Sequence, residues 1–286
     1  MMSPTLRAGR LLVATVMLVA LTLSICVIPL GAQSVSAADA PEPDELTVLS
    51  FNIRSARGDG LVPSYEERHL RALAEMIGAL APDVVLLQEL DRGVARSERV
   101  DQFAYLEEAT GMDGRFARTV NYQGGRFGLA VLTVHEIVAY EHVVLPQLGG
   151  KEPRALQQLR IRLPSGREMD LFNTHIDPRL VSRDRQIRLV LRHTERLLAG
   201  PALLAGDFNA TPSSGIMETM RTEWRDAAAH GGGDTPPATY PTRAPMLRID
   251  YVFVRGSGLE LVGIAYPDPR GISDHLPILV RLRLAH

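Results

Sequence analysis

The distribution of hydrophobic positions along the 286 residues predicts more strands than helices. Short apolar runs rich in β-branched residues recur along the chain, and their length and composition are typical of buried strands. The predicted strands cover residues 46–51, 83–88, 128–134, 137–145, 156–163, 169–174, 202–205, 249–254 and 276–280. Two other segments repeat apolar residues every three or four positions, which predicts amphipathic helices that pack on sheets. The first follows Tyr65 and ends before Pro82, and the second runs from Arg183 to Leu198.

Polar residues of the types that act in catalysis and in metal binding lie in, at or beside these predicted strands. A side chain at the end of a buried strand is carried to the rim of its sheet, where clefts form. The residues concerned are Asn52, Glu89, His175, Asp207, Asn209, Asp250, Asp274 and His275. Taken singly, each has an ordinary structural explanation, such as a satisfied core histidine or an Asx turn. Their ordered occurrence favours a single site.

The residue types indicate the chemistry of that site. Asp250 interrupts a run that otherwise has the composition of a buried strand, and a buried carboxylate needs a partner. An aspartate bonded to a histidine fixes the tautomer of the imidazole and stabilises its protonated form. Oxygen ligands suit Mg²⁺, and histidine and asparagine donors suit a phosphate oxyanion. The pattern therefore predicts metal-assisted hydrolysis of a phosphoester.

Ordered segments of the chain resemble the motifs of the endonuclease/exonuclease/phosphatase superfamily, which includes DNase I, abasic-site endonucleases, neutral sphingomyelinases and inositol polyphosphate phosphatases. The segments are residues 49–53, 87–89, 173–177, 206–209 and 273–275. The resemblance extends from Leu46 to Leu284. It implies an α/β fold, namely a four-layer sandwich of two packed mixed β-sheets flanked by helices.

The resemblance implies a metal site and names its residues. Glu89 matches the principal metal ligand of the superfamily, and Asn52 matches an asparagine that helps to hold the metal. Asp274 is expected near the metal or beside the groups that it orients. The expected cofactor is Mg²⁺, with Mn²⁺ as the alternative.

The resemblance also assigns the residues that act on the phosphoester. His175 and Asn209 are expected to contact the scissile phosphate. His275 is expected to act as general base oriented by Asp250, and Asp207 is expected to hold the attacking water or help to deprotonate it. Which of Asp207 and His275 takes the proton stays open at this point.

Three positions modify the comparison. Leu129 stands where the superfamily often has an asparagine, which removes one phosphate or structural contact. His175 stands where abasic-site endonucleases generally have a tyrosine, so DNA repair is a weaker interpretation. Arg154 is either a phosphate contact or an exposed arginine.

The N-terminus predicts export. Arg7 and Arg10 precede a largely apolar stretch over residues 11–30, and the small residues at 35–37 suit a signal peptidase. Residues 1–37 are therefore a signal peptide or, because a bilayer span needs ~20 apolar residues, a retained membrane anchor. Cys26, the sole cysteine, adds lipidation as a minor alternative. Residues 38–45 are expected to form a linker before one domain over residues 46–286.

Charge bears on the substrate. The chain has 31 basic and 33 acidic residues, and loss of the two N-terminal arginines with a signal peptide makes it more acidic. Nonspecific nucleic-acid binding depends on phosphate neutralisation, so this balance weakens that interpretation. The favoured function is an exported Mg²⁺-dependent phosphodiesterase acting on phospholipid head groups or related phosphoesters. The alternatives are a secreted DNase I-like nuclease and a non-catalytic binding module, with nucleic acid or a membrane as partner.

Overall fold

The computed structural model describes residues 44–149, 152–197, 200–230 and 236–285; the predicted signal peptide or anchor lies outside these ranges. Twelve strands in these ranges form two six-stranded sheets. The first sheet has the order β11 (Leu259–Ala265), β12 (Ile278–Leu284), β1 (Asp44–Asn52), β2 (Val84–Arg92), β4 (Gly125–Thr133) and β3 (Asp113–Tyr122). The second has the order β5 (Glu136–Leu145), β6 (Arg154–Arg162), β7 (Glu168–His175), β8 (Ala202–Asp207), β10 (Asp250–Arg255) and β9 (Arg225–Asp226).

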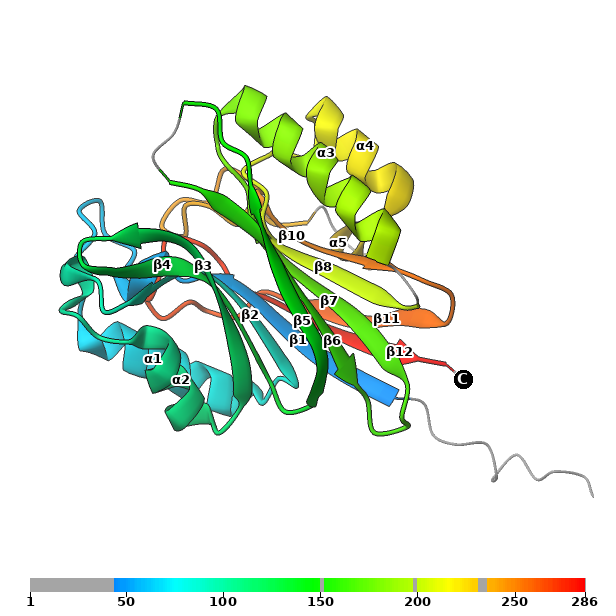
Figure 1. Ribbon diagram of the computed structural model, residues 1–286, viewed down its shortest axis with the longest axis horizontal. Coiled ribbons are helices and arrows are strands. Elements are labelled where there is room, and N and C mark those ends of the chain that lie inside the picture. Colours follow the sequence, from blue (N-terminus) through cyan, green and yellow to red (C-terminus); the bar gives the residue numbers. More distant parts are fainter. Residues whose placement is uncertain (1–43, 150–151, 198–199, 231–235, 286) are drawn as a thin grey trace, which may run out of the picture. The chain divides into compact units, whose positions relative to one another are not determined.

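Both sheets are mixed, and helices cover their outer faces (Figure 1). Strands β1 and β2 are parallel, as are β7 and β8, whereas the remaining pairs are antiparallel. Helices α1 (Glu67–Leu80) and α2 (Gln102–Thr110) lie on the first sheet. Helices α3 (Leu180–Leu197) and α4 (Gly215–Glu223) lie on the second, and the short helix α5 (Ala227–His230) follows β9. This arrangement confirms the predicted four-layer sandwich.

Alternating apolar positions of the strands build the core between the sheets. Val48 of β1, Leu86 of β2, Leu171 of β7 and Val252 of β10 belong to one buried cluster there. Neighbouring strand positions point outward and pack under the helices, which buries both faces of the central strands. A rigid, doubly covered sheet fixes the positions of the residues at its strand ends.

The predicted helices and most predicted strands are confirmed, with shifted ends. Helix α3 begins at Leu180, earlier than the predicted Arg183. Strand β1 begins at Asp44 and so includes the last two residues of the predicted linker. Strand β12 begins at Ile278 and not at Leu276, because the Leu276 amide donates to Thr239 O (2.8 Å) and Pro277 has no amide hydrogen. Within the described ranges, no helix has the length and apolar character needed to cross a bilayer.

Candidate active site

The polar residues predicted from the strand ends meet at one end of the sandwich. Asn52 ends β1, Glu89 lies in β2, His175 and Asp207 end β7 and β8, and Asp250 begins β10. Sheet register places Asp207 directly beside His175 on one side and Asp250 on the other. The cavity between the two sheets at this end has a volume of ≈ 640 Å³, and the predicted residues that line it are Glu89, His175, Asp207, Asn209, Asp274 and His275.

Asp207 reaches the cavity because its neighbour is a glycine. Gly206 has φ +143°, and a Cβ atom there would lie 1.9 Å from the Thr174 carbonyl oxygen of β7. Only glycine allows the two parallel strands to approach so closely. Any larger residue would push β8 away and move the Asp207 carboxylate.

Glu89 sits on an irregularity in its strand. Its φ is 61°, and the pairing of β2 with β4 shifts register between Leu87 and Leu90, as in a β-bulge. Ser55 Oγ donates to the Glu89 carbonyl oxygen over 3.0 Å and so supports this conformation. Left-handed backbone at a non-glycine residue is costly and is concentrated at functional sites. Here it turns the Glu89 side chain toward the cavity.

A buried ion pair stabilises the segments that hold Glu89 in place. The carboxylate of Asp91, fully buried, accepts from Arg96 Nε (2.8 Å) and Nη2 (2.9 Å). Arg96 Nη2 also lies 3.2 Å from Ser55 Oγ, and Gln102 Nε2 donates to Ser55 O over 2.7 Å. The turn after β1 and the bulge of β2 are therefore held as one unit.

The oxygen donors around Glu89 suit a hard divalent cation. Asn52 Nδ2 lies 3.2 Å from Glu89 Oε1 and 3.0 Å from Asp207 Oδ2. In the described part of the chain, Glu89 forms no ion pair, although its carboxylate lines the cavity. Asp274 adds a second carboxylate, and Arg54 Nε contacts its Oδ2 at 3.3 Å. Asn52 Oδ1 accepts from the Arg54 amide (3.1 Å), so a direct metal contact through that oxygen would require rotation of the Asn52 amide.

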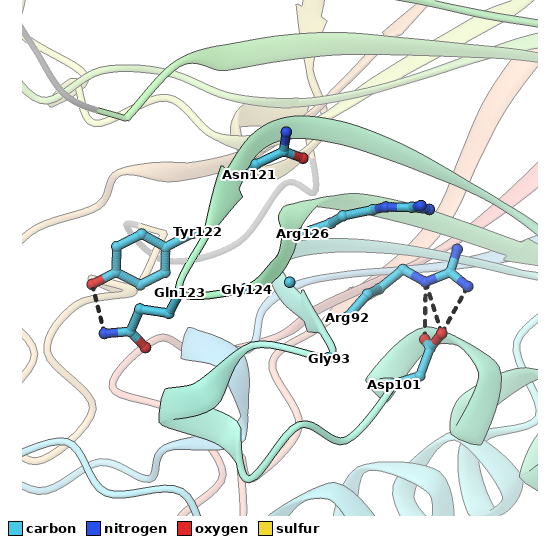
Figure 2. A pocket seen from close by; sticks show the side chains of 9 residues that line it. Arg92, Gly93, Asp101, Asn121, Tyr122, Gln123, Gly124 and Arg126 are labelled. Atoms are coloured by element: carbon cyan, nitrogen blue, oxygen red, sulfur yellow. Dashed lines mark hydrogen bonds and ion pairs between the residues drawn. The ribbon is translucent and has the colours of Figure 1, made fainter.

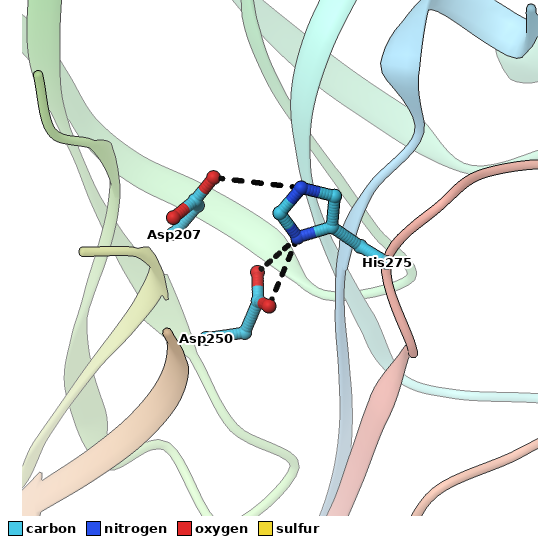
Figure 3. Close-up of side chains that lie close together, drawn as sticks. All are labelled: Asp207, Asp250 and His275. Carbon is cyan, nitrogen blue, oxygen red and sulfur yellow. Dashed lines mark hydrogen bonds and ion pairs between the residues drawn. The ribbon is translucent and has the colours of Figure 1, made fainter. Parts of the chain in front are cut away.

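Asp207, Asp250 and His275 form a second, hydrogen-bonded group (Figure 3). The ring nitrogen Nδ1 of His275 lies 3.1 and 3.0 Å from the two oxygens of Asp250, and Nε2 lies 3.9 Å from Asp207 Oδ2. Because Asp250 already occupies Nδ1, this group functions better as a proton-handling set than as a metal site. The Ser273 hydroxyl donates to Asn52 O (2.7 Å) and accepts from the His275 amide (3.2 Å), which connects the group to β1.

The two groups have strongly perturbed protonation equilibria. Burial of the carboxylate, together with the nearby charge of Asp250, raises the pKa of Asp207 to about 7. Burial alone would lower the pKa of His275, but the charge and hydrogen bond of Asp250, together with the charges of Asp207 and Asp274, outweigh burial and raise that pKa to about 10. At neutral pH, His275 is therefore protonated, whereas Asp207 is close to its midpoint.

His175 is held in one neutral tautomer. Its Nδ1 lies 3.1 Å from Arg154 Nη1, which can only donate, so the ring proton is on Nε2. Burial and the adjacent Arg154 cation lower the pKa of His175. Nε2 points toward Asp207 Oδ2 at 3.4 Å. Arg154 itself is buried and lines the cavity, so the exposed alternative for this arginine is wrong.

Asn209 lies beside His175. Its side-chain Nδ2 donates to Ile176 O (2.9 Å) and lies 3.4 Å from His175 Nε2. Its amide donates to Asp207 Oδ1 over 2.9 Å, with φ of 49° at Asn209. Asn209 thus adds a second donor on the histidine side of the cavity.

The sequence did not identify two residues of this region, Tyr240 beside His275 and Thr239 beside Asp250. The ring of Tyr240 lies 4.8 Å from the ring of His275, and Tyr240 lines the cavity. Thr239 Oγ1 accepts from the amides of Ile249 (3.1 Å) and Asp250 (3.2 Å), which fixes the start of β10. The sequence feature that points to Tyr240 and Thr239 is the glycine- and proline-rich segment 230–237, which comes directly before them.

Leu129 forms no part of the cavity. The side chain is buried against Ala117 and Ala155 in a small apolar cluster between the sheets.

A second cavity of ≈ 620 Å³ lies at the turn between β3 and β4 (Figure 2). There Arg92 is neutralised by Asp101, and no histidine lines the walls.

The sequence model of the Endonuclease/Exonuclease/phosphatase family matches residues 49–275. The chain belongs to this family. Uncharacterized protein YbhP of Escherichia coli K12 is 24% identical over an alignment of 266 residues that covers 85% of this chain and all of YbhP. Members of the endonuclease/exonuclease/phosphatase family are phosphoesterases and nucleases, so hydrolysis of phosphoesters is the chemistry of this fold.

Solved structures share the fold at lower identity. The human Nocturnin catalytic domain with bound sulfate has a TM-score of 0.69 and 21% identity, covering 85% of this chain and 94% of that one. A mannosyl-6-phosphatase from Bacteroides thetaiotaomicron has a TM-score of 0.67 and 22% identity, covering 83% and 99%. These similarities confirm the fold of the family.

Proposed function

We propose that the chain is a divalent-metal-dependent phosphodiesterase that acts on phospholipid head groups or related phosphoesters. The observation that carries the proposal is the position of the Asp207 carboxylate. Asp207 Oδ2 faces Asn52 of the oxygen-donor group, His175, and His275 of the proton-handling group, all from one wall of a cavity. A water molecule and a phosphoester in that cavity would have a base, proton donors and a cation site within reach.

In this proposal Glu89 and Asp274 would hold Mg²⁺ or Mn²⁺, with Asn52 Nδ2 aligning the carboxylate of Glu89. The cation would polarise the phosphoester and offset its developing negative charge. The fit rests on the donor chemistry, since carboxylate oxygens at a cavity wall are the ligands that Mg²⁺ takes. Of the two carboxylates, Glu89 is the one without an ion-pair partner among the described residues.

Asp207 is the better candidate for the base that takes the proton of the attacking water. A general base works best when its pKa is near the working pH, and that of Asp207 is about 7. His275, with a pKa of about 10, would keep its proton and donate a hydrogen bond from Nε2 to a phosphate oxygen. Asp250 acts through His275 as a positioning residue.

His175 and Asn209 would bind the remaining phosphate oxygens. The Nε2–H of neutral His175 is a donor without charge, held in place by Arg154. Asn209 Nδ2 lies beside it. Preorganised donors of this kind stabilise negative charge as it develops, without reorganisation during the reaction.

A secreted nuclease is the second candidate, and the arginines of the cavity favour it. Arg54, Arg57, Arg154 and Arg183 line the cavity, and arginine is suited to phosphate contacts. A non-catalytic binding module is the weakest candidate, because each proposed catalytic group reaches the cavity or a neighbour that does. Export, by a signal peptide or a retained anchor in residues 1–37, is part of the proposal and rests on the sequence pattern there.

The test is hydrolysis by the chain from Ala38 onward, with Mg²⁺, of sphingomyelin, plasmid DNA and a chromogenic phosphodiester in parallel. Chelator-sensitive turnover that is lost in His275→Ala supports the proposal, and the preferred substrate separates lipid from nucleic acid. His142→Ala is the matched control, because His142 is exposed on β5 and does not line the cavity. Equal turnover by His275→Ala and His142→Ala would refute the proposed site.

A further inference from the structure

Exposed hydrophobic side chains gather around the mouth of the active-site cavity. Six such residues, here called the apolar rim, are Leu61, Val62, Leu148, Leu180, Val181 and Met246, with exposed fractions between 44% and 97%. Among the large hydrophobic side chains of the described residues, the four most exposed all belong to this rim. Single exposed hydrophobics are common on protein surfaces, but their concentration around one opening is not.

Each part of the rim is continuous with a cavity wall. Pro63, Pro178 and Leu247 line the cavity. Val62 directly precedes Pro63, Met246 directly precedes Leu247, and Leu180 follows Pro178 by two residues. Consecutive Cα atoms are 3.8 Å apart, so every rim residue except Leu148 lies within two residues of one that lines the cavity.

Polar contacts hold two of the rim segments against the catalytic residues. Arg54 Nη1 donates to the carbonyl oxygens of Gly58 (3.0 Å) and Gly60 (2.9 Å), while its Nε contacts Asp274. Arg243 Nη2 contacts Asp59 Oδ1 over 2.8 Å, which joins the loop of Leu61 and Val62 to the loop of Met246. These two apolar segments are therefore fixed relative to each other.

The third segment is held in the same way. Ser182 Oγ lies 3.1 Å from the Leu148 amide and 3.5 Å from the Leu148 carbonyl oxygen, so the loop after β5 is tied to the start of α3. Arg183 Nη1 then contacts Asn209 O over 3.3 Å. Hydrogen bonds thus join Leu148 to the start of α3, which carries Leu180 and Val181, and join α3 to Asn209.

The interior of the cavity has the opposite character. Arginine side chains line it, and Arg57 forms no ion pair with a carboxylate among the described residues. A polar cavity that contains arginines and a proposed cation site, inside an apolar border, is complementary to a phosphate attached to hydrocarbon chains. A nucleic acid offers phosphate without that hydrocarbon.

We propose that the apolar rim docks the enzyme on a lipid surface, with the rim side chains among the acyl chains and the cavity over the head-group phosphate. This inference rests on the proposed function and narrows its substrate to an amphiphile in an interface. A protein or a second copy of the chain bound to the rim would close the opening that the substrate must enter. A lipid surface covers the rim and supplies the substrate at the same time.

Vesicle sedimentation in the presence of a chelator tests docking without turnover. The vesicles are phosphatidylcholine alone and phosphatidylcholine mixed with phosphatidylglycerol. The variants are Leu61→Ser/Val62→Ser and Met246→Ser, and the matched control is Val134→Ser, an exposed valine next to Thr133 at the far end of β4. Thermal unfolding of each variant establishes that it is folded.

The expected result is vesicle binding by the wild type and by Val134→Ser, with at least about a tenfold weaker partition for Leu61→Ser/Val62→Ser. Burial of an apolar side chain in a hydrocarbon environment is favourable, and the tenfold change corresponds to about 1.4 kcal/mol. Wild-type partition of the rim variants, or no binding by the wild type, overturns the proposal. So does a dimer, formed without vesicles, that the rim substitutions dissociate.

The assay on a water-soluble phosphodiester separates this inference from the function on which it rests. If the wild-type enzyme hydrolyses the soluble substrate but does not bind vesicles, the proposed function is supported and docking on a lipid surface is refuted. Vesicle binding through the rim without any phosphoester turnover supports docking and refutes the proposed function.

Discussion

Replacement of Asp250 by asparagine tests the proton-handling group of Asp207, Asp250 and His275. The substitution keeps the shape of the side chain and removes the charge that lies 3.0 and 3.1 Å from His275 Nδ1. Both side chains are buried, so solvent does not replace the lost interaction. Asp250→Asn should therefore leave the fold intact and change the protonation of two neighbours.

The structure gives the size and direction of that change. Among the groups that raise the pKa of His275, Asp250 contributes most. The net rise from the ordinary value of 6.5 to about 10 corresponds to about 5 kcal/mol. Without it, burial of the imidazole prevails and the His275 pKa falls. Asp250 also raises the pKa of Asp207, so that pKa falls as well.

These shifts predict the pH dependence of kcat/KM. Activity that needs ionised Asp207 and protonated His275 rises as the pH passes about 7 and falls as it approaches about 10. In Asp250→Asn both limbs move to lower pH. On the alkaline side of the wild-type optimum, where the variant His275 loses its proton at a lower pH than the wild-type residue, kcat/KM should fall by about 10²–10⁴-fold.

The assay is the pH profile of kcat/KM on a chromogenic phosphodiester with saturating Mg²⁺. Asp170→Asn is the matched control, because Asp170 is an equally buried, arginine-paired carboxylate of the second sheet that does not line the cavity. The control should keep the wild-type profile. If Asp250→Asn also retains both limbs, Asp250 does not set the protonation of His275 and the proposed roles are wrong.

Three further changes test other parts of the site. Arg154→Met should lower kcat/KM about 10–100-fold in steady-state assays, because the histidine that it holds loses its fixed tautomer; unchanged kinetics would exclude that role. Mg²⁺ should raise the melting temperature of the wild type but not of Glu89→Gln, since a ligand of the folded state stabilises it; an equal increase would place the metal elsewhere. Arg96→Ala leaves Asp91 buried without its partner and should cost about 3–5 kcal/mol in urea unfolding, whereas Arg71→Ala on the exposed face of α1 should cost under about 1 kcal/mol; similar costs would show that the buried pair is unimportant.

Local patterns in the sequence were sufficient to predict most of the polar residues at the open end of the sandwich, whereas the sandwich itself was implied by the resemblance to the superfamily. Apolar runs that end on Asn52, Glu89 and His175 have the strand period. The structure places Asn52 and His175 at strand ends as predicted, but the prediction that Glu89 ends its strand is wrong, because β2 continues past the bulge at Glu89 to Arg92. Weakly patterned elements such as β3 and β11 were missed. Their half-exposed edge positions alternate irregularly, so the hydrophobic pattern has little contrast there.

Contacts between distant segments could not be read from the sequence. Thr239 fixes Asp250 through two backbone amides, and Arg96 supports the bulge of Glu89 through Ser55. Neither residue lies in a motif of its own. Their importance arises only when the sheets bring these segments together, so no local pattern could have identified them.

The protonation of Asp207 shows where sequence reasoning must end. A carboxylate after an apolar strand is recognisable as a site residue, but its pKa of about 7 is set by burial and by the charge of Asp250 on the neighbouring strand. Asp250 in turn holds the proton on His275, which is delivered by a third segment. The choice of base that the sequence left open between Asp207 and His275 thus depends on how the sheet pairs β8 with β10, and that pairing favours Asp207.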